Sequence, residues 1–202
     1  PATSGSNGTD GYYVDTGSLI PTLTNSGTIN GGNGGNGGNG FAVGDNADGA
    51  DGGNSGSGIY NKGTISTLVN TGTITAVDGG NGGLPASGGS RGHDGFTGSG
   101  IYVDSVGILG SFTNLGNITG PIGIWNEGNI TSLNNSGLIS GNGGAGYSGI
   151  YSNGVIENLI NNSTITSSFY AGLYLDSLSQ TGTIVNNDLI SGAVGLATGS
   201  LI

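Results

Sequence analysis

Apolar and polar residues alternate in a pattern that recurs six times along the chain. Each copy has a large apolar residue, Asn, a small or polar residue, and Ile at alternate positions, as in Leu68-Val69-Asn70-Thr71-Gly72-Thr73-Ile74. The Asn and the final Ile occur in every copy, and the copies begin at Leu23, Leu68, Phe112, Leu133, Leu159 and Ile184. A period of two places alternate residues on one face of a β-strand. We therefore predict short strands with an apolar inner face.

A second anchor precedes each copy, in which an apolar residue is followed by an aromatic one, as in Gly58-Ile59-Tyr60. Ile101 and Ile124 of this anchor are 23 residues apart, and so are Ile150 and Leu173. Repeated short strands at a spacing of about 23 residues indicate the turns of a parallel β-helix. Leucine-rich repeats have a similar period, but their multi-Leu signature is absent. Residues 1–202 are thus predicted to be a single all-β domain, a parallel β-helix (solenoid) that is right-handed, as is usual for the class.

The six repeated asparagines have the same strand parity as the inward apolar residues. Left unpaired inside the helix, each would cost roughly 1–3 kcal/mol. Stacked in register, each amide can donate to the next, which predicts an Asn ladder of Asn25, Asn70, Asn114, Asn135, Asn161 and Asn186. The Asn-x-Gly sequence is also typical of a bend, because both residues tolerate left-handed backbone angles. The pattern leaves both interpretations open.

Three Gly-rich inserts interrupt the repeats, near residues 31–57, 76–99 and 141–148. They leave the coil at the same register, so we expect them on one side of the solenoid. Loops on one side of a solenoid often form its binding face, and a flexible tolerated insertion is the alternative. The chain has 48 Gly but only 4 Pro and no collagen-type Gly-X-Y period with proline.

Acidic residues suggest one cation site and several turns. Asp45, Asp48 and Asp51 lie in the first insert, and carboxylates on a flexible loop are ligands that calcium prefers. Calcium at these three residues is the only cofactor that the sequence suggests. Between the aromatic residue and the next repeat, three coils have a corner that is two residues longer than in the others. Each of these corners contains one aspartate, which we interpret as a turn residue: Asp15, Asp104 and Asp176. Glu127 and Glu157 have no obvious partner.

The aromatic residues of the second anchor share one register and should form a stripe: Tyr13, Tyr60, Tyr102, Trp125, Tyr151 and Tyr174. If the preceding apolar residue faces inward, the stripe faces outward. An exposed stripe could stack on sugar rings or bind a protein. The alternative is that the rings only shield one another between coils.

Charge and catalytic chemistry are scarce. The chain has 12 acidic residues against Lys62 and Arg91, a net charge of −10. This balance argues against nucleic acid and anionic membranes as partners, because both require clusters of Lys and Arg. Cysteine is absent, so no disulfide is expected. Arg91, His93 and Asp94 fall together in a Gly-rich insert, which we interpret as chance, and we predict no catalytic residue and no enzyme.

On these residues the chain resembles the passenger repeats of bacterial autotransporter adhesins, with their Leu-x-Asn-Ser-Gly-x-Ile-x-Gly runs. The matching stretches are Leu23-Thr24-Asn25-Ser26-Gly27-Thr28-Ile29-Asn30-Gly31 and Leu133-Asn134-Asn135-Ser136-Gly137-Leu138-Ile139-Ser140-Gly141. The resemblance implies secretion to a Gram-negative cell surface and attachment to the outer membrane through a C-terminal barrel that this sequence does not contain. It also implies roles in adhesion, aggregation, biofilm formation or virulence.

We therefore expect a stalk segment that binds a host surface protein, a glycan or another copy of itself. A polysaccharide-degrading β-helix enzyme is the main alternative, and it would need several acids gathered with Arg91 in a groove. A passive spacer is a further alternative. Ice binding through Thr-x-Thr arrays is a weaker one, because the other copies break the array with Asn30, Asn117, Leu138 and Leu189.

Overall fold

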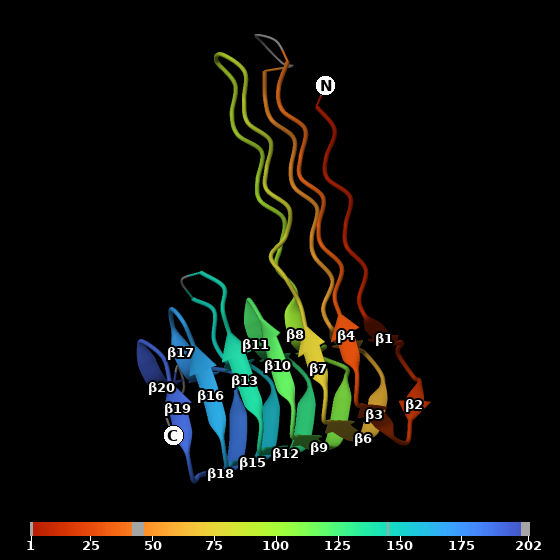
Figure 1. Cartoon of the computed structure of the whole chain (residues 1–202), viewed down its shortest axis with the longest axis vertical. Helices are drawn as coiled ribbons and strands as arrows, with labels where there is room; N and C mark the ends of the chain where they lie inside the picture. Colours follow the sequence, from red (N-terminus) through yellow and green to blue (C-terminus); the bar gives the residue numbers. More distant parts are fainter. Residues whose placement is uncertain (1, 42–46, 145, 199–202) are drawn as a thin grey trace.

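The computed structural model describes residues 2–41, 47–144 and 146–198. Within these ranges the chain forms three parallel β-sheets and no helix. Strands that are neighbours in a sheet come from successive repeats, so the sheets run along the molecule as three faces of one coil (Figure 1). The parallel β-helix predicted from the repeat is confirmed. We call this three-sheet part the shaft.

Each repeat contributes strands to the three sheets. Sheet 1 contains, in order, β1 (Tyr12–Val14), β5 (Ile59–Asn61), β8 (Ser99–Val103), β11 (Ile122–Asn126), β14 (Ile150–Ser152), β17 (Ala171–Leu175) and β20 (Val194–Thr198). Sheet 2 contains β2 (Leu19–Ile20) and β3 (Leu23–Asn25), which both pair with β6 (Thr64–Asn70), then β9 (Ile108–Asn114), β12 (Asn129–Asn135), β15 (Val155–Asn161) and β18 (Gln180–Asn186). Sheet 3 contains β4 (Thr28–Asn30), β7 (Thr73–Thr75), β10 (Asn117–Gly120), β13 (Leu138–Gly141), β16 (Thr164–Ser167) and β19 (Leu189–Ser191).

The core lies between the sheets and consists of stacked apolar side chains. Equivalent repeat residues pair across coils, so that Leu68 is opposite Phe112 in sheet 2 and Ile74 is opposite Ile118 in sheet 3. All four side chains are buried. Alternation therefore places the repeat's apolar residues inward, and burial of their side chains is the main favourable term for the coil.

The first two Gly-rich inserts form a second ordered structure, which rises from the corner between sheets 3 and 1 (Figure 1). It consists of five extended segments lying side by side, residues 2–11, 31–41, 47–57, 76–86 and 89–98. We call it the glycine bundle. The backbones of the first two inserts are hydrogen-bonded to one another, which does not fit the alternative of a flexible tolerated insertion, and the third insert lies outside the bundle. Residues 2–11 also belong to the bundle, which the repeat pattern did not indicate.

Hydrogen bonds in the bundle follow a period of three residues and run between segments. Three consecutive backbone N–H groups illustrate the rule. Gly52 donates to the carbonyl of His93 (2.8 Å), Gly53 to that of Gly35 (2.8 Å) and Asn54 to Oδ1 of Asn7 (2.9 Å). Each N–H thus points to a different neighbour. This is the threefold symmetry of a polyproline II helix, which has three residues per turn and no internal hydrogen bonds.

Glycine recurs at every third position because the segments touch backbone to backbone. A Cβ added to Gly83 would overlap the carbonyl oxygen of Gly38, and one added to Gly52 would overlap that of Gly80. The bundle therefore has a requirement like that of collagen, where only glycine fits at the crowded axis. Proline is scarce in the chain, so this local period of three does not look like a collagen repeat in the sequence.

Candidate ligand-binding face

The repeated asparagines lie inside the shaft, where they form one continuous ladder. Each Nδ2 donates to Oδ1 of the next, at 2.8 Å for every step: Asn25 to Asn70, Asn70 to Asn114, Asn114 to Asn135, Asn135 to Asn161 and Asn161 to Asn186. The Asn is also the last residue of its sheet 2 strand, so it stands at the bend toward sheet 3. The Asn therefore forms the ladder and also stands at a bend, but the reason given for the bend was wrong, because only Gly17, Gly88 and Gly146 of the described residues have a positive φ. The ladder stabilises the interior of the shaft.

The aromatic stripe lies on the outer face of sheet 1. Ile59, Ile101 and Ile124, which precede its residues, are fully buried, so the rings of Tyr60, Tyr102 and Trp125 point outward. Successive ring centroids are 5.4, 4.8, 5.5, 5.6 and 5.4 Å apart from Tyr13 to Tyr174, in edge, tilted and stacked arrangements. Such contacts add stability beyond the buried area. The rings thus shield one another and remain partly exposed.

Carboxylates from the following coil accept the hydroxyl groups of the stripe. Tyr60 Oη donates to Asp104 Oδ2 (2.9 Å) and Tyr102 Oη donates to Glu127 Oε2 (2.6 Å). Tyr151 Oη donates to Asp176 Oδ2 (2.7 Å).

These acids were missed as partners of the stripe, being interpreted as turn residues or as unpaired. A signal was available, because each acid follows the aromatic residue of its own coil by two positions and so lies on the same face of the strand. Asp104, for example, follows Tyr102.

The hydroxyl–carboxylate pairs shift the pKa of both partners. Burial and the hydrogen bonds to Glu127 and Asp176 raise the pKa of Tyr102 and of Tyr151 above the ordinary value for tyrosine. The hydrogen bond from Tyr151 lowers the pKa of Asp176. Burial alone would raise the pKa of Asp104, but the hydrogen bonds from Tyr60 and the Val106 N–H outweigh it and lower that pKa. Asp104 and Asp176 therefore stay ionised at neutral pH.

One cation of the chain itself lies on this face. The Lys62 ammonium is 5.3 Å from the ring centroid of Tyr60 and 3.8 Å from Asp104 Oδ2. It is thus held by a cation–π contact and an ion pair at once. The pKa of Lys62 is raised, chiefly by its contact with Tyr60 and then by Asp104.

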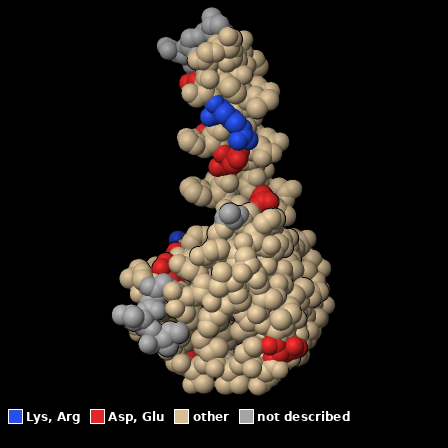
Figure 2. All heavy atoms as spheres, turned by 90° about the vertical axis from the view of Figure 1, so that its left-hand side faces the viewer, with Lys and Arg blue, Asp and Glu red and all other residues tan. Residues whose placement is uncertain are grey.

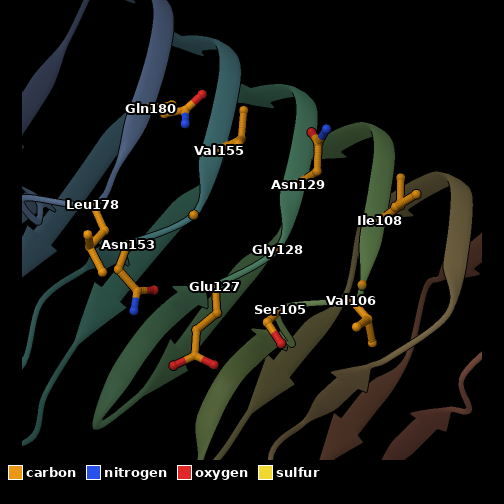
Figure 3. A pocket seen from close by; sticks show the side chains of 12 residues that line it. Ser105, Val106, Ile108, Glu127, Gly128, Asn129, Asn153, Val155, Leu178 and Gln180 are labelled. Atoms are coloured by element: carbon orange, nitrogen blue, oxygen red, sulfur yellow. The ribbon is translucent and has the colours of Figure 1, made fainter.

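A groove of about 430 Å³ runs along the corner between sheets 1 and 2 (Figure 3). The groove follows from the lengths of the corners that join sheets 1 and 2. Two coils with the shorter corner, at Gly128 and Gly154, lie between two coils whose corner is two residues longer and projects further. Val106 and Leu178, which are 57% and 73% exposed, stand at its two ends, with Glu127 and Asn153 between them (Figure 3). The shape of this face is therefore set by corner length.

A smaller pocket of about 230 Å³ lies where the glycine bundle meets the stripe. Its aromatic residues are Phe96 from the last bundle segment and Tyr102 and Trp125 from the stripe, and Glu127 supplies a carboxylate. Phe96 is 81% exposed. We call this hollow the foot pocket, because it lies at the foot of the bundle.

The calcium residues proposed from the sequence have another role in the bundle. Oδ1 of Asp48 accepts the N–H of Ser90 (2.6 Å), and Oδ1 of Asp51 accepts that of His93 (2.7 Å). Asp45 lies outside the described residues. Among the residues that are described, no group of three His, Cys, Asp or Glu side chains could hold a metal ion. Calcium binding at the three aspartates stays a prediction.

Arg91 and Asp94 of the second insert form an ion pair. Arg91 Nη2 is 2.8 Å from Asp94 Oδ1, which also accepts the N–H of Gly82 at 2.8 Å. The latter bond is the main reason that the pKa of Asp94 is lowered. In the view of Figure 2 the charged side chains concentrate on the bundle and the edge of the shaft, and most of the shaft surface is uncharged.

No protein-family model matches this chain, and neither a curated protein nor a solved structure matches it. Along the described ranges, no helix has the length and apolarity needed to cross a membrane.

Proposed function

We propose that this chain is an adhesive stalk segment of a bacterial surface protein, and that the outer face of sheet 1 makes the adhesive contact. The partner is a host surface protein, a glycan or a second copy of the chain. One observation carries the proposal, namely the uninterrupted file of six aromatic rings on the outside of the shaft. Partly exposed aromatic residues are enriched in binding surfaces, because they bury a large area at low entropic cost.

The rest of the molecule supports a structural role for the shaft. Stacked sheets, the internal Asn ladder and the packed core hold the stripe on a stiff support. A rigid support reduces the ordering cost of binding. The resemblance to autotransporter passenger repeats is the basis for the surface location. The poverty of charge suits export of the unfolded chain.

Adhesion of beads coated with the chain tests the proposal. Beads are offered to cultured epithelial cells, matrix proteins and a glycan array, and sedimentation at several concentrations, with and without calcium, measures self-association. We expect Trp125→Ala combined with Tyr151→Ala to reduce adhesion about tenfold or more, as loss of two aromatic anchors does at other interfaces.

The matched control removes two exposed apolar side chains from the rest of the shaft, Leu115→Ala with Ile160→Ala. It should leave adhesion unchanged, and thermal unfolding of both double variants verifies that they fold. Equal loss in both would refute the role of the stripe. A parent chain that neither adheres nor self-associates is a passive spacer, and turnover of an acidic polysaccharide would identify an enzyme instead.

A further inference from the structure

The foot pocket combines aromatic rings with one carboxylate, that of Glu127, and the hydroxyl groups of Ser57, Thr97 and Ser99 also line it. The hydroxyl of Tyr102 already donates to Glu127 Oε2 at 2.6 Å. Hydroxyl groups would suit a neutral ligand as well as a charged one, so the feature that selects between them is the carboxylate. Aromatic faces beside a carboxylate are the combination that attracts a cation.

The chain contains a precedent for such a cation one coil away. Lys62 places its ammonium over the ring of Tyr60 and beside Asp104, at 5.3 and 3.8 Å. Tyr60 and Asp104 each stand one coil before a residue of the foot pocket, Tyr102 and Glu127, because Tyr60 pairs in register with Tyr102 and Val103 with Asn126.

The foot pocket has no cation of its own. Besides Lys62 the sequence has only one Lys or Arg, and this residue, Arg91, is paired with Asp94. Glu127 is therefore not balanced by a Lys or Arg of the chain. The net charge of −10 adds a long-range attraction for positively charged ligands.

We propose that the foot pocket binds an organic cation, an ammonium or guanidinium group, between the rings of Phe96, Tyr102 and Trp125 and the carboxylate of Glu127. The cation is either a Lys or Arg side chain of a partner protein or a quaternary ammonium head group. This inference deepens the proposed function, on which it rests, by naming the chemistry that the adhesive face selects.

The chain's single tryptophan lines the foot pocket and also borders a second hollow beside Tyr147 and Tyr151, so its fluorescence responds to a ligand at either place, and the Glu127→Gln variant below assigns the response. The purified chain is titrated with choline, N-acetyl-lysinamide and N-acetyl-argininamide. The probe with the highest affinity shows whether the pocket prefers a quaternary ammonium head group, a Lys side chain or an Arg side chain. The neutral isostere of choline, 3,3-dimethyl-1-butanol, should bind at least about threefold more weakly, because it lacks the cation–π attraction. Added salt should weaken the binding of the three cationic probes and leave the binding of the neutral isostere unchanged.

The charge of Glu127 is tested with Glu127→Gln, which keeps an acceptor for the Tyr102 hydroxyl. We expect cation affinity to fall about fivefold, the effect of one partly exposed ion pair. Glu157→Gln is the control, since it removes the same charge from the exposed side of β15 in sheet 2. Circular dichroism verifies that both variants fold.

A gain of binding is expected from Lys62→Ala. Removing this ammonium frees the ring of Tyr60 and the carboxylate of Asp104, so a second cation should bind there. The ring resonances of Tyr60 in NMR spectra should then respond to choline in the variant and not in the parent chain.

Three outcomes would overturn the inference: equal binding of choline and its neutral isostere, a response to methyl glucoside but not to cations, or no response to any probe at saturating concentration. Probe binding requires no cell or partner protein. A chain that binds cations but does not adhere would therefore refute the proposed function alone, and one that adheres without binding cations would refute only the site.

Discussion

The shaft and the glycine bundle are held together by different parts of the same chain. In the shaft, side chains such as Leu133 and Ile139 are fully buried and stack on their counterparts in the next coil. In the bundle, the segments meet through their backbones, and the side chains that contribute are Asn and Asp accepting N–H groups. The shaft depends on buried apolar area, and the bundle depends on hydrogen bonds and on the close approach of its backbones. Replacing a large side chain by a small one should therefore damage the shaft, and replacing glycine by a larger residue should damage the bundle.

The largest effect is expected in the core of the shaft. Leu133→Ala removes a buried side chain and should lower the free energy of unfolding by about 3 kcal/mol, through lost transfer energy and a cavity. Equilibrium denaturation measures the change. Leu115→Ala, at a residue that is 53% exposed, should cost well under about 1 kcal/mol. Similar losses in both variants would contradict the description of the core.

The opposite substitution, from small to larger, should damage the bundle. The new Cβ of Gly83→Ala would collide with the carbonyl of Gly38, so we expect a local loss of about 1–3 kcal/mol. Hydrogen exchange should then increase in the bundle and stay unchanged in the shaft. Gly144→Ala is the control, because a Cβ there meets no atom within 4 Å. If both variants exchanged alike, close backbone packing would not be the reason for these glycines.

The acidic residues of the bundle should matter as acceptors and not as charges. Asp51→Asn keeps an oxygen for the N–H of His93 and should change the free energy of unfolding by less than about 0.5 kcal/mol. Asp51→Ala leaves that N–H without its partner and should cost about 1 kcal/mol. Denaturation curves at neutral pH distinguish the two. A large loss of stability in Asp51→Asn would show that the negative charge of Asp51 is needed, as a calcium site would require.

The smallest effect concerns pH and the carboxylates of the shaft. The hydrogen bond from Tyr151 lowers the pKa of Asp176 in the folded chain, so ionised Asp176 stabilises the fold above pH about 4. This contribution is lost as the pH falls through the lowered pKa, and for so exposed a pair it is below about 1 kcal/mol.

Asp176→Asn should therefore lose less stability than the parent chain between pH 5 and 2, as measured by thermal unfolding. Asp188→Asn, at an exposed acid that follows β18, is the comparison. If both substitutions flattened the pH profile equally, the tyrosine contact would not be the cause.

Most of the shaft could be predicted from local sequence pattern, and less of the candidate site could. The parity of Ile101 and Tyr102 decides which of the two faces inward, and the recurrence of the pattern decides which residues stack. The partner of Tyr60 is Asp104, 44 residues away, and this contact depends on the length of the insert between them. The foot pocket brings Phe96 of an insert against Trp125 of the shaft, which no spacing indicates.

The sequence by itself determined the parallel β-helix, because stacked coils turn the repeated Ile inward and pair the repeated Asn with one another. Tertiary structure alone decided the form of the Gly-rich inserts. A single segment such as residues 31–41 has no apolar face and makes no hydrogen bonds within itself. Its conformation depends on neighbouring segments, since residues 2–11 and 76–86 accept its N–H groups and residues 47–57 donate to its carbonyls. The same packing lays the bundle against the aromatic stripe, where backbone contacts between distant segments create the foot pocket.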